Sequence, residues 1–199
     1  MTNGLKVKKR NGRGTEPLDL EKIHNMVEEA CKDVTGVSAS QVEIQSGIQF
    51  YDGISTAEIQ DILIKSASDL ITLDNPNYQF VAARLLLFAT RKSLYGRSRD
   101  LPPLEDHIMN CTNIDVYDKE IFGKYSKEEI EKADSFIDHE RDFLFTYAGL
   151  RQVVDKYLVQ DRSTGKVYET PQFMYMMIAL TIFSNYPKET RLDLSLIHI

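Results

Sequence analysis

The sequence contains little cysteine and no long apolar run, and both shortages exclude whole classes of protein. Its 199 residues include only Cys31 and Cys111, with no CxxC pair. We therefore expect neither a disulfide scaffold nor a structural zinc site, and we predict a reducing cytoplasmic location. The longest apolar stretch, from Phe173 to Phe183, is too short to cross a bilayer. The first six residues lack the apolar core of a signal peptide.

The familiar catalytic motifs are also missing. The sequence has no GxxxxGK[ST] phosphate loop, no GxGxxG and no GxSxG. The run from Asp138 to Asp142 is dense in charge and could suggest acid–base chemistry, but we interpret it as a solvated or salt-bridged helix end. Both cysteines are interpreted as packing or surface residues. The sequence thus predicts no catalytic residue and no metal ligand within these 199 positions.

The net charge of −6 argues against a general nucleic-acid binder, although positive charge is concentrated in two places. The first cluster comprises Lys6, Lys8, Lys9, Arg10 and Arg13, and the second comprises Arg91, Lys92, Arg97 and Arg99. These clusters are either two solvated faces or parts of one anion site that the fold assembles. Composition alone favours two solvated faces.

The first hundred residues are predicted to form a β-hairpin followed by four helices. Leu5 to Arg10 alternates in polarity, Asn11 to Gly14 signals a turn, and Thr15 to Leu18 returns as an edge strand because Pro17 cannot donate a ladder bond. Helices are expected from Asp19, from a capping box at Ser38–Gln41, from a second at Ser55–Glu58, and over 78–95. The predicted inward positions are Leu20, Ile23, Val27, Ala30, Val42, Ile48, Ile59, Ile62, Leu63, Ser66, Leu70, Val81, Ala82, Leu85 and Ala89.

The segment from Gly96 to Pro103 is the best candidate for a domain boundary, because two prolines and several charges end any helix there. The following part is less regular. Helices are predicted from Ser126, over 147–157, and from Pro171 to about Ser184, with a hairpin around 162–165. The fold class is therefore mainly α, with a four-helix bundle that the first hairpin caps.

Basic residues at the ends of these elements suggest an anion site. Lys9 and Arg10 end the first strand, Lys22 lies in the first turn of the first helix, Thr56 begins the third, and Lys92 closes the fourth. A nucleoside triphosphate needs several positive charges and backbone donors at a helix N-terminus. Each residue alone is ordinary, and only their joint placement favours the site over solvated lysines.

Several segments resemble the ATP cone, the regulatory nucleotide-binding domain of ribonucleotide reductases. They are Val7–Gly12, Glu16–Ile23, Ile48–Ile54 with Thr56, and Tyr78–Leu85. The resemblance continues into the class I large (α) subunit through Phe136–Asp142, Lys156–Gln160 and Phe183–Leu192, and covers roughly residues 5–192.

The resemblance implies a binding site for ATP and dATP as allosteric effectors, with Mg²⁺ accompanying the nucleotide. By this resemblance the lysines would hold phosphates, Thr56 would bond a phosphate, and Glu16 and Asp19 would meet the base or sugar. Gln60 stands where relatives often have histidine, which bears on inhibition by dATP. The implied site residues are Lys9, Arg10, Glu16, Pro17, Leu18, Asp19, Leu20, Glu21, Lys22, Thr56, Ile59 and Lys92.

The resemblance also implies domains and partners. Residues 5–96 would form the cone, residues 97–192 the helical region that begins the reductase α/β barrel, and residues 193–199 a tail unlike the family. The catalytic cysteines of the family lie beyond position 199, so the chain would be an inactive fragment of a truncated reading frame. The complete protein would reduce ribonucleoside diphosphates with thioredoxin or glutaredoxin as a homodimer, together with a radical-generating β subunit.

Two other interpretations remain open. A free-standing ATP-cone regulator would need a zinc ribbon with two CxxC pairs, which this sequence lacks. A helical domain whose lysines are merely solvated would not explain the resemblance outside the cone. Neither membrane nor nucleic acid is expected as a partner.

Overall fold

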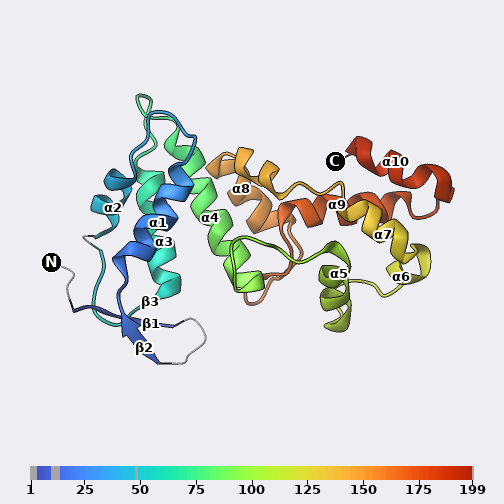
Figure 1. The fold of residues 1–199 in the computed structure, drawn as a ribbon, viewed down its shortest axis with the longest axis horizontal. Coiled ribbons are helices and arrows are strands. Elements are labelled where there is room, and N and C mark those ends of the chain that lie inside the picture. The colour runs from blue at the N-terminus through green and yellow to red at the C-terminus, as the bar shows by residue number, and fades with distance from the viewer. Residues whose placement is uncertain (1–3, 10–13, 48, 199) are drawn as a thin grey trace. The chain divides into compact units, whose positions relative to one another are not determined.

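The computed structural model describes residues 4–9, 14–47 and 49–198, with side chains up to residue 194. The chain is mainly helical, as predicted, and carries two small sheets (Figure 1). It divides into two compact units, of which the first comprises residues 1–89 with 143–151 and the second comprises residues 90–142 with 152–199. Among the described residues no helix is long and apolar enough to span a membrane.

The sheet of the first unit contains one strand more than the predicted hairpin. Its strands are β1 (Lys6–Lys8), β2 (Thr15–Pro17) and β3 (Ile54–Ser55), in the order β2-β1-β3. The β1–β2 pair is antiparallel and β2 lies at the edge, so the hairpin and the edge position of Pro17 are confirmed. Strand β3 pairs in parallel with β1 and was not predicted. Of the predicted turn, positions 11–13 lie outside the described residues, as does Arg10.

Four helices follow in the first unit, close to the predicted positions. They are α1 (Leu20–Cys31), α2 (Ala39–Gly47), α3 (Thr56–Asp69) and α4 (Tyr78–Tyr95), whose last residues belong to the second unit. Helices α1 and α3 both begin directly beside the small sheet (Figure 1). The caps at Asp19 and Ser55 are confirmed, the latter as a reciprocal capping box with Glu58.

Burial in these helices departs from the predicted stripes at a few positions. Leu20 is exposed, so its predicted place in the core is wrong, whereas Ile23, Val27 and Ala30 are buried. Ala89, Ile62 and Leu70 are only half-buried, and Ile48 lies outside the described residues. The remaining predicted positions are buried: Val42, Ile59, Leu63, Ser66, Val81, Ala82 and Leu85.

The start of α2 is held by a core tyrosine from α4. The Tyr78 hydroxyl accepts the Ser38 amide at 3.0 Å and donates to Gln41 Oε1 at 2.5 Å. Tyr78 is almost completely buried. The Ser38 amide and the Gln41 side chain, which a capping box would pair directly, are thus joined through the Tyr78 hydroxyl, and this contact connects α2 to α4.

The second unit is mostly helical and more regular than the sequence indicated. Its α-helices include α5 (Leu104–Asn113), α6 (Ile121–Lys124), α7 (Lys127–Asp134), α9 (Pro171–Phe183) and α10 (Lys188–His198). Between α7 and α9 the chain forms a 3₁₀ helix (His139–Leu144), α8 (Tyr147–Gln152), a π turn (Val153–Tyr157) and the hairpin of β4 (Gln160–Asp161) with β5 (Lys166–Val167). Of this segment, residues 143–151, with most of α8, belong to the first unit. Helix α5 was not predicted, whereas the capping box at Ser126, the hairpin and the start at Pro171 are confirmed.

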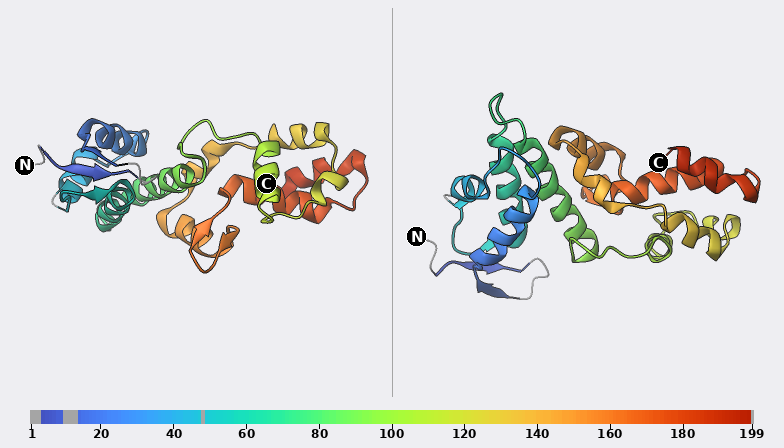
Figure 2. Two further views of the ribbon diagram at one scale, coloured as in Figure 1. Left: turned by 90° about the horizontal axis from the view of Figure 1, so that it is seen from below. Right: turned by 45° about the horizontal axis from the view of Figure 1, so that its top comes forward.

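The core of the second unit forms around α9. Phe173, Met176 and Leu180 of α9 pack with Leu104 of α5 and Ile130 of α7. Helix α10 lies along α9 in both views of Figure 2. Helix α10 continues through His198, across the positions that the sequence analysis assigned to a non-family tail.

Candidate nucleotide-binding site

The parallel pairing of β1 with β3 brings two predicted site residues to the same end of the small sheet. The register places Val7 opposite Ile54 and Lys8 opposite Ser55. Lys9 directly follows the paired residues of β1, and Thr56 directly follows those of β3. Because the pair is parallel, both residues lie at the same end of the sheet. A bond from the Gly53 amide to the Lys6 carbonyl, at 2.8 Å, holds the other end of this pair.

Lys9 also contacts strand β2. Its Nζ lies 2.7 Å from Glu16 Oε2, and its amide donates to the Gly14 carbonyl at 3.2 Å. Glu16 pairs with Val7 in the ladder, so the side chains of Val7, Lys9 and Glu16 share one face of the sheet. Since Val7 is buried, this is the face toward the helices. The hydrogen bond from Lys9 lowers the pKa of Glu16, which keeps this carboxyl ionised at neutral pH.

The segment from Glu16 to Lys22 lines a shallow hollow of about 520 Å³ at the start of α1. Asp19 caps the helix by accepting the Glu21 amide at 3.1 Å and the Lys22 amide at 3.2 Å. Lys22 Nζ also lies 3.2 Å from the Asp19 carboxylate. Hydrogen bonds from the Lys22 amide and side chain lower the pKa of Asp19. Pro17, Leu18 and Leu20 complete this wall, whereas Glu21 does not line it.

Thr56 occupies the first position of α3. The capping box of Ser55 uses the amides of Ser55 and Glu58, with bonds of 2.9 and 3.1 Å. The amides of Thr56 and Ala57 belong to the same first turn, where amides have no partner within the helix. An anion beside Thr56 would meet these donors, its hydroxyl and the positive end of the helix dipole.

The structure does not gather all the predicted site residues. Ile59 is buried in α3 and Gln60 lies beside it, 5% exposed. Lys92 lies exposed in the last turn of α4, beyond the division between the units. Those that the first unit does gather are Lys9, Glu16, Pro17, Leu18, Asp19, Leu20, Glu21, Lys22 and Thr56.

The arrangement separates positive groups from ionised carboxylates. Lys9, Lys22 and the first turn of α3 suit phosphate oxygens, which accept charge-assisted hydrogen bonds. Glu16 and Asp19 only accept hydrogen bonds when ionised, so they suit hydroxyl and amino groups of a sugar or base. Among the described residues no group of three or more His, Cys, Asp or Glu side chains could hold a metal ion.

The charge-dense segment 138–142 has a structural role. Asp142 is buried and accepts a bond from Arg91 Nη2 at 3.0 Å, whereas Arg141 and Asp138 form an exposed pair at 3.7 Å. The interpretation as a salt-bridged helix end holds for Asp142, but that pair is buried rather than solvated. Arg91 is 2% exposed, so the second basic cluster is not one solvated face.

Two protein-family models match this chain, one in its first half and one in its second half. The ATP cone domain matches residues 5–93, and the all-alpha domain of ribonucleotide reductase matches residues 143–195. The chain is 47% identical over 193 residues to ribonucleoside-diphosphate reductase 1 subunit alpha of Escherichia coli K12, covering 97% of this chain and 25% of the relative. The corresponding subunit of Haemophilus influenzae is also 47% identical, with the same coverage.

A more distant relative aligns in the same way. The alpha subunit of phage T4 is 42% identical over 175 residues, which cover 87% of this chain and 23% of that subunit. The chain thus spans about a quarter of the length of the curated relatives that it matches.

Proposed function

This chain belongs to the family of ribonucleoside-diphosphate reductase α subunits, and on that premise we propose that residues 5–96 form an ATP cone that binds ATP and dATP as allosteric effectors. The four helices and the small sheet would act as one bundle that the sheet caps. Residues 97–192 would begin the reductase core. The observation that carries the proposal is the parallel β1–β3 pairing, which brings Lys9 beside the first turn of α3.

Each group would have a distinct role in the bound state. Lys9, Lys22 and Thr56 would hold the phosphates, Arg10 would add charge directly after Lys9 in the sequence, and Mg²⁺ would accompany the nucleotide. Glu16 and Asp19 would bond the sugar or base, where Pro17, Leu18, Leu20 and Glu21 would supply the remaining surface. The Lys9–Glu16 pair supports this assignment, because it holds the lysine on the helix-facing side of the sheet before a ligand arrives.

The two effectors differ by one hydroxyl, so direct contact can separate their affinities only modestly. One hydrogen bond contributes about 0.5–1.5 kcal/mol net, which is a factor of about 2 to 13 in Kd. A larger regulatory effect requires an assembly with two states that the ligand biases. We propose that this assembly comprises the homodimer of the complete protein and its radical-generating β subunit.

The complete protein would reduce ribonucleoside diphosphates to deoxyribonucleoside diphosphates for DNA synthesis. The match of residues 143–195 to the all-alpha domain favours this reading over a free-standing cone regulator. The predicted cytoplasmic location stays a prediction, and so does the effect of Gln60 on inhibition by dATP.

Calorimetric titration of ATP and dATP into the purified chain tests the site. Lys9→Ala should weaken both ligands about 10-fold or more, since a hydrogen bond to a charged group contributes about 1.5–3 kcal/mol. Thr56→Ala should weaken both by a smaller factor of about 2 to 13, as expected for one neutral donor.

Lys65→Ala is the matched control, because Lys65 is exposed on the same helix α3 and its ammonium pairs with Asp69. It should leave both affinities unchanged. A folded chain that binds neither nucleotide, or equal losses in all three variants, would refute the proposed site.

A further inference from the structure

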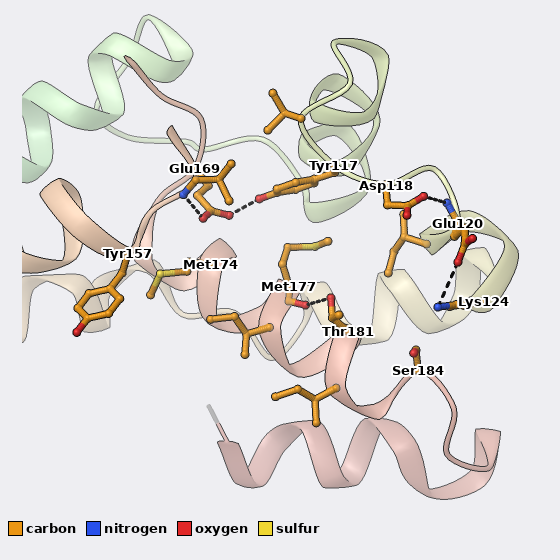
Figure 3. Close-up of a pocket in the computed structure, with 15 residues that line it drawn as sticks. Tyr117, Asp118, Glu120, Lys124, Tyr157, Glu169, Met174, Met177, Thr181 and Ser184 are labelled. Atoms are coloured by element: carbon orange, nitrogen blue, oxygen red, sulfur yellow. Dashed lines mark hydrogen bonds and ion pairs between the residues drawn. The ribbon is translucent and has the colours of Figure 1, made fainter. Parts of the chain in front are cut away.

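A cavity of about 450 Å³ lies in the second unit, far in the sequence from the proposed nucleotide site. Figure 3 shows its residues along α9, with Met174, Met177 and Thr181 in succession. Ile121 of α6 and Ile178 and Ile182 of α9 add apolar surface. Most of the wall is therefore hydrophobic, as in typical small-molecule sites.

One end of the cavity carries a buried carboxylate. Glu169 is 1% exposed and accepts the Val159 amide at 2.7 Å and the Tyr117 hydroxyl. Figure 3 shows Glu169 and Tyr117 pointing toward one another at this end. Among the described residues no lysine, arginine or histidine forms an ion pair with Glu169. Burial raises the pKa of Glu169, and the two hydrogen bonds oppose that shift.

The rest of the charged lining is also acidic. Asp118 and Glu120 line the cavity, and its single lysine among the described residues, Lys124, pairs with Glu120 at 3.4 Å. With Glu169 ionised, the lining carries three negative charges against one positive charge. A carboxylate removed from water without a cation gains most from a ligand that supplies one.

We infer that this cavity is a binding site for a small amphiphilic amine, whose ammonium group bonds Glu169 and whose hydrocarbon part lies against α9. The charge of the lining selects the cation, because an anion would meet three carboxylates. The apolar wall selects the hydrocarbon, since a second ammonium group placed against Met174, Met177 or Ile178 would lose its water without gaining a polar partner there. Each oxygen of Glu169 can accept a second bond beside the one it makes now.

Hexylammonium, hexanol and hexanoate are suitable probes because they share one hydrocarbon chain and differ in the head group. Titration of each into the isotopically labelled chain, followed by NMR, should show saturable shifts for hexylammonium at Met174, Met177 and Ile178. Hexanol should bind at least 10-fold more weakly, and hexanoate should not bind. Equal binding of hexanol, or no binding of hexylammonium, overturns the inference.

Variants separate the carboxylate from the apolar wall. Glu169→Gln keeps the shape of the side chain and should weaken hexylammonium about 10-fold without changing hexanol. Glu120→Gln is the matched control, since that carboxylate already has Lys124, and it should have less than a 2-fold effect. Unchanged hexylammonium affinity in Glu169→Gln overturns the inference.

A second variant covers the case in which Glu169→Gln does not fold. Ile182 lines the cavity and is 54% exposed, so Ile182→Lys should fold. The lysine would place a cation at the cavity and should abolish hexylammonium binding. Sedimentation at two protein concentrations tests the competing occupant. If the chain self-associates through this wall and Ile182→Lys separates the copies, the inference is overturned in favour of an interface.

Discussion

Arg191 of α10 should be one of the largest single contributors to the stability of the second unit. Its Nε donates to Glu129 Oε1 at 2.7 Å, and its Nη2 donates to the same carboxylate. The guanidinium lies 4.1 Å from the centre of the Tyr125 ring and is 4% exposed. Arg191 therefore connects α10 to α7 by a bidentate pair and by a cation–π contact, which lysine cannot reproduce.

Breaking a buried ion pair by removing one partner costs about 3–5 kcal/mol. Glu129 keeps one bond in the variant, because the Ser126 amide donates to its Oε2 at 2.9 Å. Its side chain also has 14% exposure, which admits some water. We therefore take the lower end and expect Arg191→Met to lower the free energy of unfolding by about 3 kcal/mol. With a urea m-value of about 1–3 kcal/mol per molar, the midpoint falls by roughly 1–3 M.

Urea unfolding followed by circular dichroism measures this change. Arg191→Lys should lose part of the same free energy, because it keeps the charge but not the planar fork. Lys132→Ala is the matched control on the same two helices, since Lys132 and Asp193 are exposed and 3.7 Å apart. It should change stability by less than about 1 kcal/mol.

The pH dependence gives an independent check on the same pair. Burial tends to raise the pKa of Glu129, but hydrogen bonds from Arg191 and the Ser126 amide outweigh it and lower the pKa. This contribution is present above the ordinary pKa of glutamate and is lost as pH falls through the lowered value. The difference between the wild type and Arg191→Met should therefore narrow in acid. Equal midpoints of Arg191→Met and Lys132→Ala at neutral pH would refute the reasoning.

Three further predictions concern caps and titrating pairs. Ser55→Ala removes the capping oxygen of α3 and should lower the free energy of unfolding by about 1 kcal/mol in urea, while Ser68→Ala on the same helix should not. The hydrogen bond to Glu43, with the charge of Glu28, raises the pKa of His24. That stabilisation is complete below the ordinary histidine pKa and is lost as pH rises through the raised value. Glu43→Gln should therefore lower the His24 pKa in an NMR titration. An unchanged pKa would contradict the pairing of His24 with Glu43. Burial raises the pKa of Asp142 to about 6 against the attraction of Arg91. The unfolding free energy should therefore fall as pH rises from the ordinary aspartate pKa to about 6, and a slope that persists in Asp142→Asn would rule out this assignment.

Local signals made most helix starts predictable from the sequence. Asp19, Ser55 and Ser126 each cap the helix that follows, and Pro171 stands at the first turn of α9. Their chemistry acts within three or four residues, so it is readable without the fold. Helix α5 has no side-chain cap at Pro103, yet Leu104, Ile108 and Cys111 recur at helical spacing and could have revealed it.

Strand β3 could not be predicted because its two residues have too little pattern of their own. It is a strand only because β1 pairs with it, and the paired residues, Val7 with Ile54 and Lys8 with Ser55, lie far apart in the sequence. The proposed nucleotide site depends on that pairing, because it places Lys9 and Thr56 at the same end of the sheet. The sequence motifs pointed to the right segments, but their adjacency is a product of tertiary structure.

The dependence on a distant partner also explains why Arg91 and Asp142 were expected at the surface. Arg91 belongs to a run with Lys92, Arg97 and Arg99, and the three others are exposed as a solvated run would be. Arg91 differs because Asp142, 51 positions away, meets it inside the second unit. Burying that pair costs desolvation that only its geometry repays, so nothing in the local sequence marks it. Whether an arginine at the end of an amphipathic helix is buried or exposed can therefore be predicted only when its partner is known.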